Sequence, residues 1–184
     1  MSAKRKLTPV QQTEPLRLDL GCGTRKQAGY IGVDCRAFEG VDLVHDLRQL
    51  WPWEDGAVEE VYCSHTVEHL PGIERVHFFN ELYRVLRTGA KATIITPHWS
   101  NACAYGDPTH QWPPMSEWYA LYLNKAWRDK EAPHTGYICD FDFVSGFGFD
   151  ERVMAWNDER RMFGLAHHLN AARDLHVTLT KRGA

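Results

Sequence analysis

The chain has 184 residues, of which 43% are hydrophobic and 24% charged, and a formal net charge of −3 at pH 7. These values predict a single soluble globular domain and give no electrostatic case for nucleic-acid binding. We expect residues 1–13, which include the basic cluster Lys4-Arg5-Lys6, to form a disordered tail, and residues 14–184 to form the domain.

The five cysteines are Cys22, Cys35, Cys63, Cys103 and Cys139, and no two of them form a C-x-x-C pair. An odd number without such pairs favours reduced thiols and a cytoplasmic protein. We expect neither a signal peptide nor a membrane contact, because no apolar run approaches the ~18 residues of a membrane span.

Short apolar runs alternate with turn signals in the first half of the chain. They predict strands at residues 16–20, 30–34, 41–46, 58–64 and 91–96, and a helix at about 73–87 with Gly89 as its C-terminal cap. Only nine residues separate Leu20 from Tyr30 and six separate Asp34 from Val41, whereas a parallel crossover usually takes a dozen or more. The first crossover helices should therefore be shortened, which leaves one sheet face thinly covered unless later segments or a second copy cover it.

The second half begins with an aromatic stretch at residues 98–133, which holds Trp99, Trp112, Trp118 and Trp127. We expect this stretch to be a substrate-side insertion or lid, with a helix at 117–128. Strands are expected at 138–144 and 175–180, with a partly helical polar segment between them. The predicted fold is α/β, a Rossmann-like open sheet of seven strands that is mostly parallel, with an antiparallel C-terminal strand.

The segment "LDLGCGTRKQAGYIGVD", residues 18–34, carries most of the functional information. A strand runs directly into G-x-G, whose glycines allow a ligand to approach the backbone, and Asp34 ends the next strand, where a carboxylate can accept hydrogen bonds from ribose hydroxyls. A dinucleotide loop would have a third glycine where Lys26 stands, and no nucleoside triphosphate P-loop motif occurs. The site therefore suits a nucleoside without a pyrophosphate.

Five ordered motifs resemble those of class I S-adenosylmethionine-dependent methyltransferases. They are "LDLGCG", "IGVD", "HDL" at residues 45–47, "VEEVYCSHTVEHL" and "ELYRVLRTGAKATIITP", and together they run from about Leu16 to Pro97. The last motif departs mildly from the family pattern, because Thr88 and Ala90 replace a proline and a glycine.

The resemblance implies S-adenosyl-L-methionine as cofactor and assigns roles by position. Gly21, Cys22 and Gly23 would line its methionine part, and Asp19 would support either the loop or the amino group of the cofactor. Asp34 would hold the ribose, and its neighbour Cys35 would also contact the cofactor. The adenine would meet Asp46 and the backbone of Leu47, and Ser64 and His65 would lie near the sulfonium. A strand-end turn carboxylate is the alternative role for Asp46.

His65, Glu68 and His69 also spell H-x-x-E-H, a zinc-peptidase pattern that requires both histidines on one helix. Pro71-Gly72 would stop such a helix almost at once, and the glycine loop would be left unexplained. We therefore prefer the methyltransferase interpretation and expect no metal ligands. His69 could contact the acceptor substrate or simply cap or pack the following helix.

The acceptor pocket of this fold commonly includes the loop after the fifth strand. Here that loop offers Trp99, Asn101, Tyr105 and Asp107 as substrate-binding candidates, and His98 and His110 as candidates for a base. A tryptophan-rich lid packed on itself is the structural alternative. We expect a small-molecule or sugar-like acceptor, because the flipped-base motif of amino-methylating DNA enzymes is missing after the fourth strand. A nucleic-acid methyltransferase and a non-catalytic, cofactor-binding scaffold protein remain the alternative functions.

Overall fold

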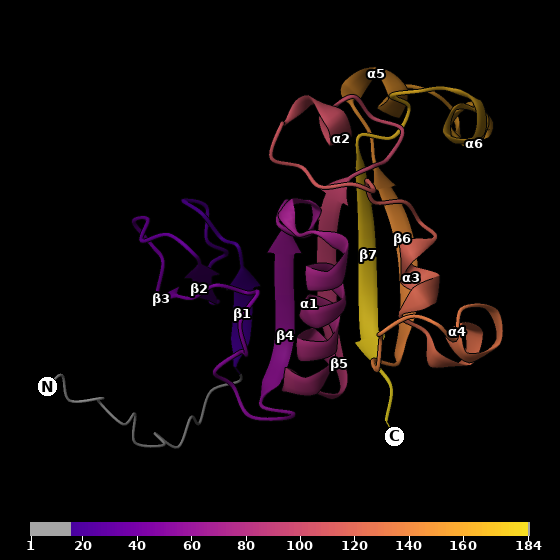
Figure 1. The fold of residues 1–184 in the computed structure, drawn as a ribbon. Helices are drawn as coiled ribbons and strands as arrows, with labels where there is room; N and C mark the ends of the chain where they lie inside the picture. The colour runs from indigo at the N-terminus through magenta and orange to yellow at the C-terminus, as the bar shows by residue number, and fades with distance from the viewer. Residues whose placement is uncertain (1–15, 184) are drawn as a thin grey trace, which may run out of the picture.

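The computed structural model describes residues 16–183, which form one seven-stranded sheet in the order β3-β2-β1-β4-β5-β7-β6 (Figure 1). The predicted tail at 1–13 lies outside the described residues. The strands are β1 (Arg17–Leu20), β2 (Ile31–Asp34), β3 (Leu43–Val44), β4 (Val58–Ser64), β5 (Leu86–Pro97), β6 (Phe141–Gly148) and β7 (Asp174–Lys181). The helices are η1 (Val67–His69), α1 (Gly72–Val85), α2 (Cys103–Gly106), α3 (Tyr119–Tyr122), α4 (Lys125–Glu131), α5 (Glu151–Met154) and α6 (Asp158–His167).

The pairing of the strands confirms the predicted fold class. β3, β2, β1, β4 and β5 are parallel, and the C-terminal strand β7 runs antiparallel between β5 and β6. The parallel strands therefore end at one edge of the sheet, where ligands of open α/β sheets bind. In the described part of the chain, no helix is long and apolar enough to cross a membrane.

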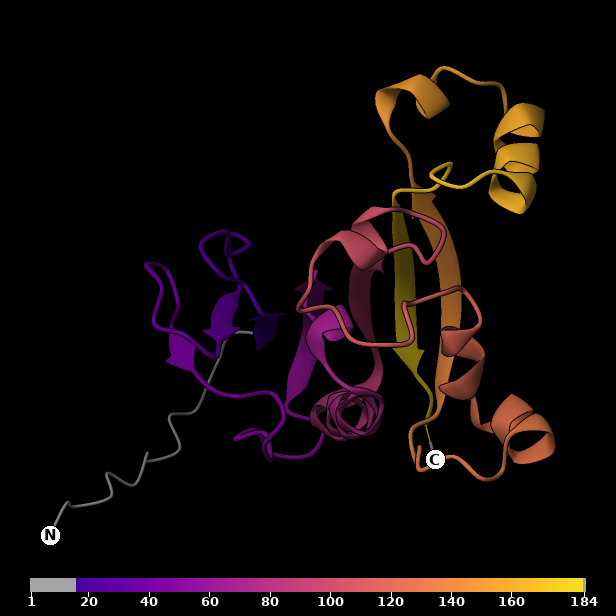
Figure 2. The ribbon, with the colours of Figure 1, turned by 45° about the horizontal axis from the view of Figure 1, so that its top comes forward.

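The two sheet faces are covered very differently. On one face, the fully buried side chains of Leu18, Val61 and Ile94 belong to the hydrophobic core with α1. Figures 1 and 2 show α1 lying across this face, and α3 packs beside it through Phe79 and Tyr119, whose ring centroids are 5.7 Å apart. This apolar layer supplies most of the hydrophobic stabilisation.

The opposite face lacks the helices that crossovers normally provide. The connections from β1 to β2 and from β2 to β3 contain only turns. The stem of Lys26 partly replaces the first helix, because a Cβ on Gly32 would lie 2.6 Å from Lys26 Cδ. In the middle of the sheet, Tyr62, Thr93 and Thr178 form a register row that is partly exposed. We expected shortened helices in these two crossovers, and the structure has no helix in either of them.

Three local predictions were wrong in detail. The helix after β4 ends at Val85, and Gly89 lies within β5 with a φ of 79° rather than capping the helix. The helix expected at 117–128 is split into α3 and α4, because Asn124 adopts an extended conformation and caps α4 by accepting from the N–H of Trp127. The third strand contains only Leu43–Val44.

The stretch 98–133 has two structural roles. Its first part, with α2, lies above the carboxyl ends of β4 and β5 (Figure 1). Its second part belongs to the core, because Met115, Ala120 and Leu123 are buried in the main hydrophobic cluster. Only the first part can therefore act as a lid over a site at the sheet edge.

Candidate functional site

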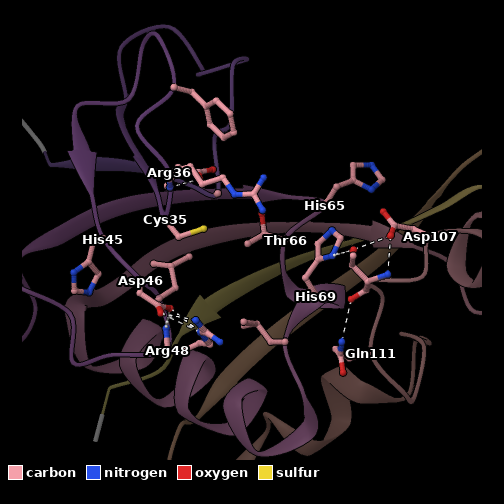
Figure 3. Close-up of a pocket in the computed structure, with 16 residues that line it drawn as sticks. Cys35, Arg36, His45, Asp46, Arg48, His65, Thr66, His69, Asp107 and Gln111 are labelled. Carbon is pink, nitrogen blue, oxygen red and sulfur yellow. Dashed lines mark hydrogen bonds and ion pairs between the residues drawn. The ribbon is translucent and has the colours of Figure 1, made fainter.

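A cavity of about 660 Å³ lies at the carboxyl ends of β1, β2 and β4, a size within the range typical of small-molecule sites. Figure 3 shows its residues projecting inward from the strand ends and from the loop above them. It is lined by Gly21, Asp34, Cys35, Arg36, Phe38, His45, Asp46, Leu47, Arg48, His65, Thr66, His69, Leu70, Asp107, Thr109 and Gln111.

The glycine loop is fastened to β2 by three main-chain donors. The N–H groups of Gly21 and Cys22 both donate to the carbonyl of Val33, over 2.7 and 3.1 Å. The N–H of Gly23 donates to Oδ2 of Asp34 over 3.0 Å. The loop and the acid predicted to hold one ligand are therefore in direct contact, and Gly21 and Asp34 line the same cavity.

Gly21 has two separate reasons to be glycine. Its φ of 73° is in the left-handed region, and a Cβ there would lie 2.0 Å from Oγ1 of Thr66. Thr66 follows β4 and donates its hydroxyl to the carbonyl of Leu20 over 3.3 Å. The close approach of these segments shapes the floor of the cavity.

Asp34 presents its carboxylate at the end of β2. Oδ1 accepts the N–H of Arg36 over 2.9 Å, and Oδ2 accepts from Gly23. Each carboxylate oxygen can accept a further hydrogen bond. Asp34 can therefore both hold the loop and bind hydroxyl groups of a ligand.

The predicted cofactor residues divide into two groups. Gly21, Asp34, Cys35, Asp46, Leu47 and His65 line the cavity. Asp19, Cys22, Gly23 and Ser64 are not among the lining residues. Asp19 contacts the loop, as one of its two expected roles requires: its Oδ2 accepts the N–H of Gln27 over 2.7 Å, and burial raises its pKa.

Asp46 is paired with Arg48, a residue that sequence reasoning did not include. The two side chains form a bidentate ion pair with a shortest distance of 2.7 Å, visible in Figure 3. The hydrogen bond from Arg48 lowers the pKa of Asp46. Arg48 already donates to both oxygens, so an adenine amine would have to share Asp46 with it or displace it.

The lining of the cavity also includes His65, His69, Asp107 and Thr109. His65 has a φ of 54°, and its Nδ1 lies 3.2 Å from Oε1 of Glu68, a neighbour that raises the pKa of His65. The left-handed His65 is followed by the short 3₁₀ helix η1, so His65 and His69 do not share the continuous α-helix that a zinc-peptidase motif requires.

Several residues predicted to contact the acceptor lie outside the cavity lining. His98 is buried, with Nδ1 2.8 Å from the Ser100 hydroxyl and Nε2 3.3 Å from Glu117. Asn101 is also buried and donates to the carbonyl of Ala172. Trp99 and Tyr105 are exposed at 42% and 57%. The roles of these four residues as a base or as acceptor contacts stay predictions.

His110 lies beside the cavity rather than in its lining. Its ring centroid is 4.8 Å from that of His69, and its Nδ1 is 3.2 Å from the carbonyl of Ala104. Of the acceptor candidates, His69 and Asp107 do line the cavity.

Sequence reasoning missed eight lining residues: Arg36, Phe38, His45, Arg48, Thr66, Leu70, Thr109 and Gln111. Most of them are immediate neighbours of predicted residues at strand ends, which is the one signal that could have identified them. Thr109 and Gln111 come from the loop above the sheet, whose course had no sequence signal.

Comparison with known proteins identifies the fold. Residues 18–94 match a family model described as "Methyltransferase domain". A SAM-dependent methyltransferase from Archaeoglobus fulgidus superposes with a TM-score of 0.65 at 20% identity, covering 91% of this chain and 86% of that chain. This chain has the class I methyltransferase fold.

Two further structures are similar to this class I methyltransferase fold. A SAM-dependent methyltransferase from Methanosarcina mazei has a TM-score of 0.55 at 14% identity, covering 94% of this chain and 95% of that chain. Geranyl diphosphate C-methyltransferase from Streptomyces coelicolor A3(2), solved with Mg²⁺, geranyl-S-thiolodiphosphate and S-adenosyl-L-homocysteine, has a TM-score of 0.54 at 15% identity, covering 92% of this chain and 70% of that chain. No curated protein matches the chain.

Proposed function

We propose that this chain transfers a methyl group from S-adenosyl-L-methionine to a small-molecule or sugar-like acceptor. The observation that carries the proposal is the shared cavity of Gly21 and Asp34, joined through the hydrogen bond from Gly23. A nucleoside can meet the bare backbone of the loop and the carboxylate of Asp34 at the same time. The similar structures named above, one of them with S-adenosyl-L-homocysteine bound, support the same ligand.

S-adenosyl-L-methionine, when bound, supplies a methyl group on a positively charged sulfur, so the leaving group becomes neutral. The protein then needs little acid catalysis; its residues must align the acceptor and exclude water. Asp34 would hold the ribose, and Leu47 would border the adenine with Asp46 or Arg48. Thr66 and His65, at the end of β4, would face the methyl group.

A compact acceptor is supported by the lid over the cavity. Asp107, Thr109 and Gln111 border it from above, leaving a polar wall suited to hydroxyl or amine groups. Arg48 is neutralised by Asp46, and the net charge of the chain is −3. Both facts favour a small molecule over a nucleic acid, whose binding relies on a positive surface. The five free cysteines support a reducing compartment such as the cytoplasm.

Two measurements test the proposal in sequence. Thermal unfolding with and without S-adenosyl-L-homocysteine should show a higher midpoint with the nucleoside, because a ligand of the native state stabilises it. Transfer of labelled methyl groups from S-adenosyl-L-methionine to a panel of alcohols, amines, sugars and oligonucleotides then identifies the acceptor. Binding without transfer to any of them would favour the non-catalytic alternative, and no thermal shift would contradict the proposal.

We also propose that a second copy of the chain covers the open sheet face around Tyr62, Thr93 and Thr178. Parallel sheets are rarely left exposed on one side. Sedimentation equilibrium should therefore give twice the 21.2 kDa chain mass, and a Tyr62→Lys substitution should shift the protein to monomers. A monomeric wild-type protein would contradict this assembly.

A further inference from the structure

Three side chains gather beside the cavity in an arrangement that methyl transfer does not require. Glu68 and His69 come from η1, and His110 from the loop after α2. One potential metal-ligating atom from each of them lies within 4.8 Å of the other two. Such a convergence brings a carboxylate and two imidazoles together from segments about forty residues apart in the sequence.

Glu68 is a buried carboxylate whose ion-pair partner among the described residues is His65, a side chain that is 47% exposed. The exposed fraction of Glu68 is 4%, and neither of its carboxylate oxygens accepts a hydrogen bond from the described residues. Nδ1 of His65 lies 3.2 Å from Oε1, within ion-pair distance when His65 is protonated but outside hydrogen-bond geometry. A buried carboxylate normally requires hydrogen bonds, a charged partner or a metal ion.

Arg75 is close to Glu68 but uses its donors elsewhere. Its guanidinium donates to the carbonyls of Val67, Glu68, Gln111 and Pro113. Its hydrogen bonds tie η1 to the segment just after His110. Arg75 therefore holds the two halves of the cluster together without satisfying the carboxylate.

The hydrogen bonds of His69 determine which of its ring nitrogens is free. The hydroxyl of Thr109 donates to Oδ1 of Asp107 over 2.7 Å, since a carboxylate can only accept. Thr109 has no second proton, so at 3.0 Å it must accept the proton of His69 Nδ1. Figure 3 shows this chain from His69 to Asp107. Nε2 of His69 is left with a free lone pair.

His110 adopts the same protonation pattern for a simpler reason. Its Nδ1 faces the carbonyl of Ala104 at 3.2 Å, and a carbonyl can only accept. The proton therefore lies on Nδ1, and Nε2 carries the lone pair. Histidines that bind metals typically donate their other ring N–H to a carboxylate or carbonyl in this way.

We propose that Glu68, His69 and His110 form a binding site for a divalent cation of the zinc, manganese, iron or cobalt type. A carboxylate and two imidazoles are a ligand set that these ions accept, and three protein ligands leave positions open for another molecule. Oδ2 of Asp107, 3.9 Å from Nε2 of His110, adds negative charge beside the site. The sequence predicts no metal ligands, and the proposal departs from that expectation because the fold brings these three side chains together.

Because the cation site borders the cavity, we infer that the cation binds the methyl acceptor. This inference rests on the proposed methyl transfer. His69, Asp107 and Thr109 line the same cavity as Asp34. The open positions of a cation there would bind an oxygen ligand, so the acceptor class is a molecule that presents hydroxyl, carboxylate or phosphate oxygens. This selects oxygen-rich acceptors over amines and hydrocarbons.

Cobalt(II) absorption provides the direct test on the intact chain. Titration of the metal-free wild-type protein should give one visible d–d band that saturates at one Co²⁺ per chain, without the near-ultraviolet band that a cysteine thiolate such as Cys35 would add. Glu68→Gln and His110→Ala should each weaken binding by at least about tenfold. Glu151→Gln and His134→Ala, at exposed positions outside the cluster, should bind as the wild type does.

A positioning variant and a spectrum test the protonation pattern. Thr109→Val removes only the hydroxyl that fixes His69, and should weaken Co²⁺ binding by about ten- to a hundredfold. Long-range ¹H–¹⁵N spectra of the metal-free wild-type protein should show His69 and His110 protonated at Nδ1. These spectra need no variant, so the test stands even if a substitution prevents folding.

The cation site and its role in methyl transfer can be contradicted independently of each other. Wild-type protein that binds S-adenosyl-L-homocysteine but not Co²⁺, or cluster variants that bind Co²⁺ as tightly as the wild type, would overturn the cation site alone. Co²⁺ binding that depends on the cluster, in a protein that does not bind the nucleoside, would support the cation site and overturn the methyl-transfer role given to it.

Discussion

Gly23 and Asp34 are joined by a hydrogen bond of 3.0 Å, in which the main-chain N–H of the glycine donates to the carboxylate Oδ2. The bond ties the loop after β1 to the end of β2. Because Gly21 and Asp34 also line one cavity, the carboxylate has two tasks: it shapes the loop and remains available to a ligand. The following predictions separate these tasks and test the surroundings of the site.

Asp34→Asn should weaken S-adenosyl-L-homocysteine binding by about ten- to a hundredfold, since hydrogen bonds to a charged acceptor contribute about 1.5–3 kcal/mol. The amide keeps one acceptor oxygen, so the loop can still bond to it. Isothermal titration calorimetry measures the effect. Asp142→Asn, at an exposed acid on β6 paired with Arg182, is the matched control. Equal affinities for Asp34→Asn and wild type would remove Asp34 from the site.

Gly21→Ala should destabilise the fold more than Gly23→Ala does. Both glycines have positive φ, 73° and 51°, so each alanine costs roughly 1–2 kcal/mol of backbone strain. Only at Gly21 does the new Cβ also clash, 2.0 Å from Thr66 Oγ1, whereas nothing lies within 4 Å at Gly23. Urea unfolding of both variants compares the two costs. The close-packing account fails if the two free energies of unfolding fall equally.

Glu81→Gln should cost about 2 kcal/mol at neutral pH, because the carboxylate accepts from Arg84 and from the main-chain N–H of Trp51. These bonds hold α1 against the segment that follows Leu47. Arg84 lowers the pKa of Glu81 in the folded state. The stabilisation is therefore present above the unfolded pKa of about 4.3 and is lost as the pH falls through the lower folded value.

Urea unfolding of wild type and Glu81→Gln at pH 7 and pH 3 checks this dependence. The difference in the free energy of unfolding should shrink at the lower pH. Glu151→Gln, at an exposed glutamate, should give a small difference at both. A difference of the same size at both values of pH would show that the carboxylate charge is not the cause.

His98→Gln tests whether this histidine is structural. Burial lowers its pKa, so the unfolded chain takes up a proton more readily than the folded one. Wild-type protein should therefore lose stability relative to the variant as the pH falls from about 6.5 through the folded pKa. Unfolding experiments at pH 8 and pH 5.5 measure the difference. A strong loss of S-adenosyl-L-homocysteine binding in the variant would instead place His98 at the ligand.

Local sequence signals predicted that the glycine loop and Asp34 lie together, because each signal specifies a strand end. A strand followed by G-x-G, and another ending in Asp34, must place their ends at one edge of a parallel sheet. Arg48 was missed because its pairing with Asp46 depends on a turn whose course has no sequence pattern. Cys22 and Ser64 were expected to line the site, but neither is among its lining residues.

The acceptor side could not be predicted in the same way. Residues 98–133 are irregular, so the positions of His98, Asn101 and His110 depend on long-range contacts. Asn101, for example, is held by the carbonyl of Ala172, 71 residues away. The approach of His110 to Glu68 likewise depends on Arg75, whose hydrogen bonds to Glu68 and Gln111 span both segments.

A crystal structure of the chain with S-adenosyl-L-homocysteine tests the central claim most directly. The account predicts one nucleoside in the cavity, with its ribose hydroxyls on Asp34, its adenine beside Leu47 and its sulfur toward Thr66. A nucleoside bound elsewhere, or an adenosine that contacts neither the glycine loop nor Asp34, would contradict it.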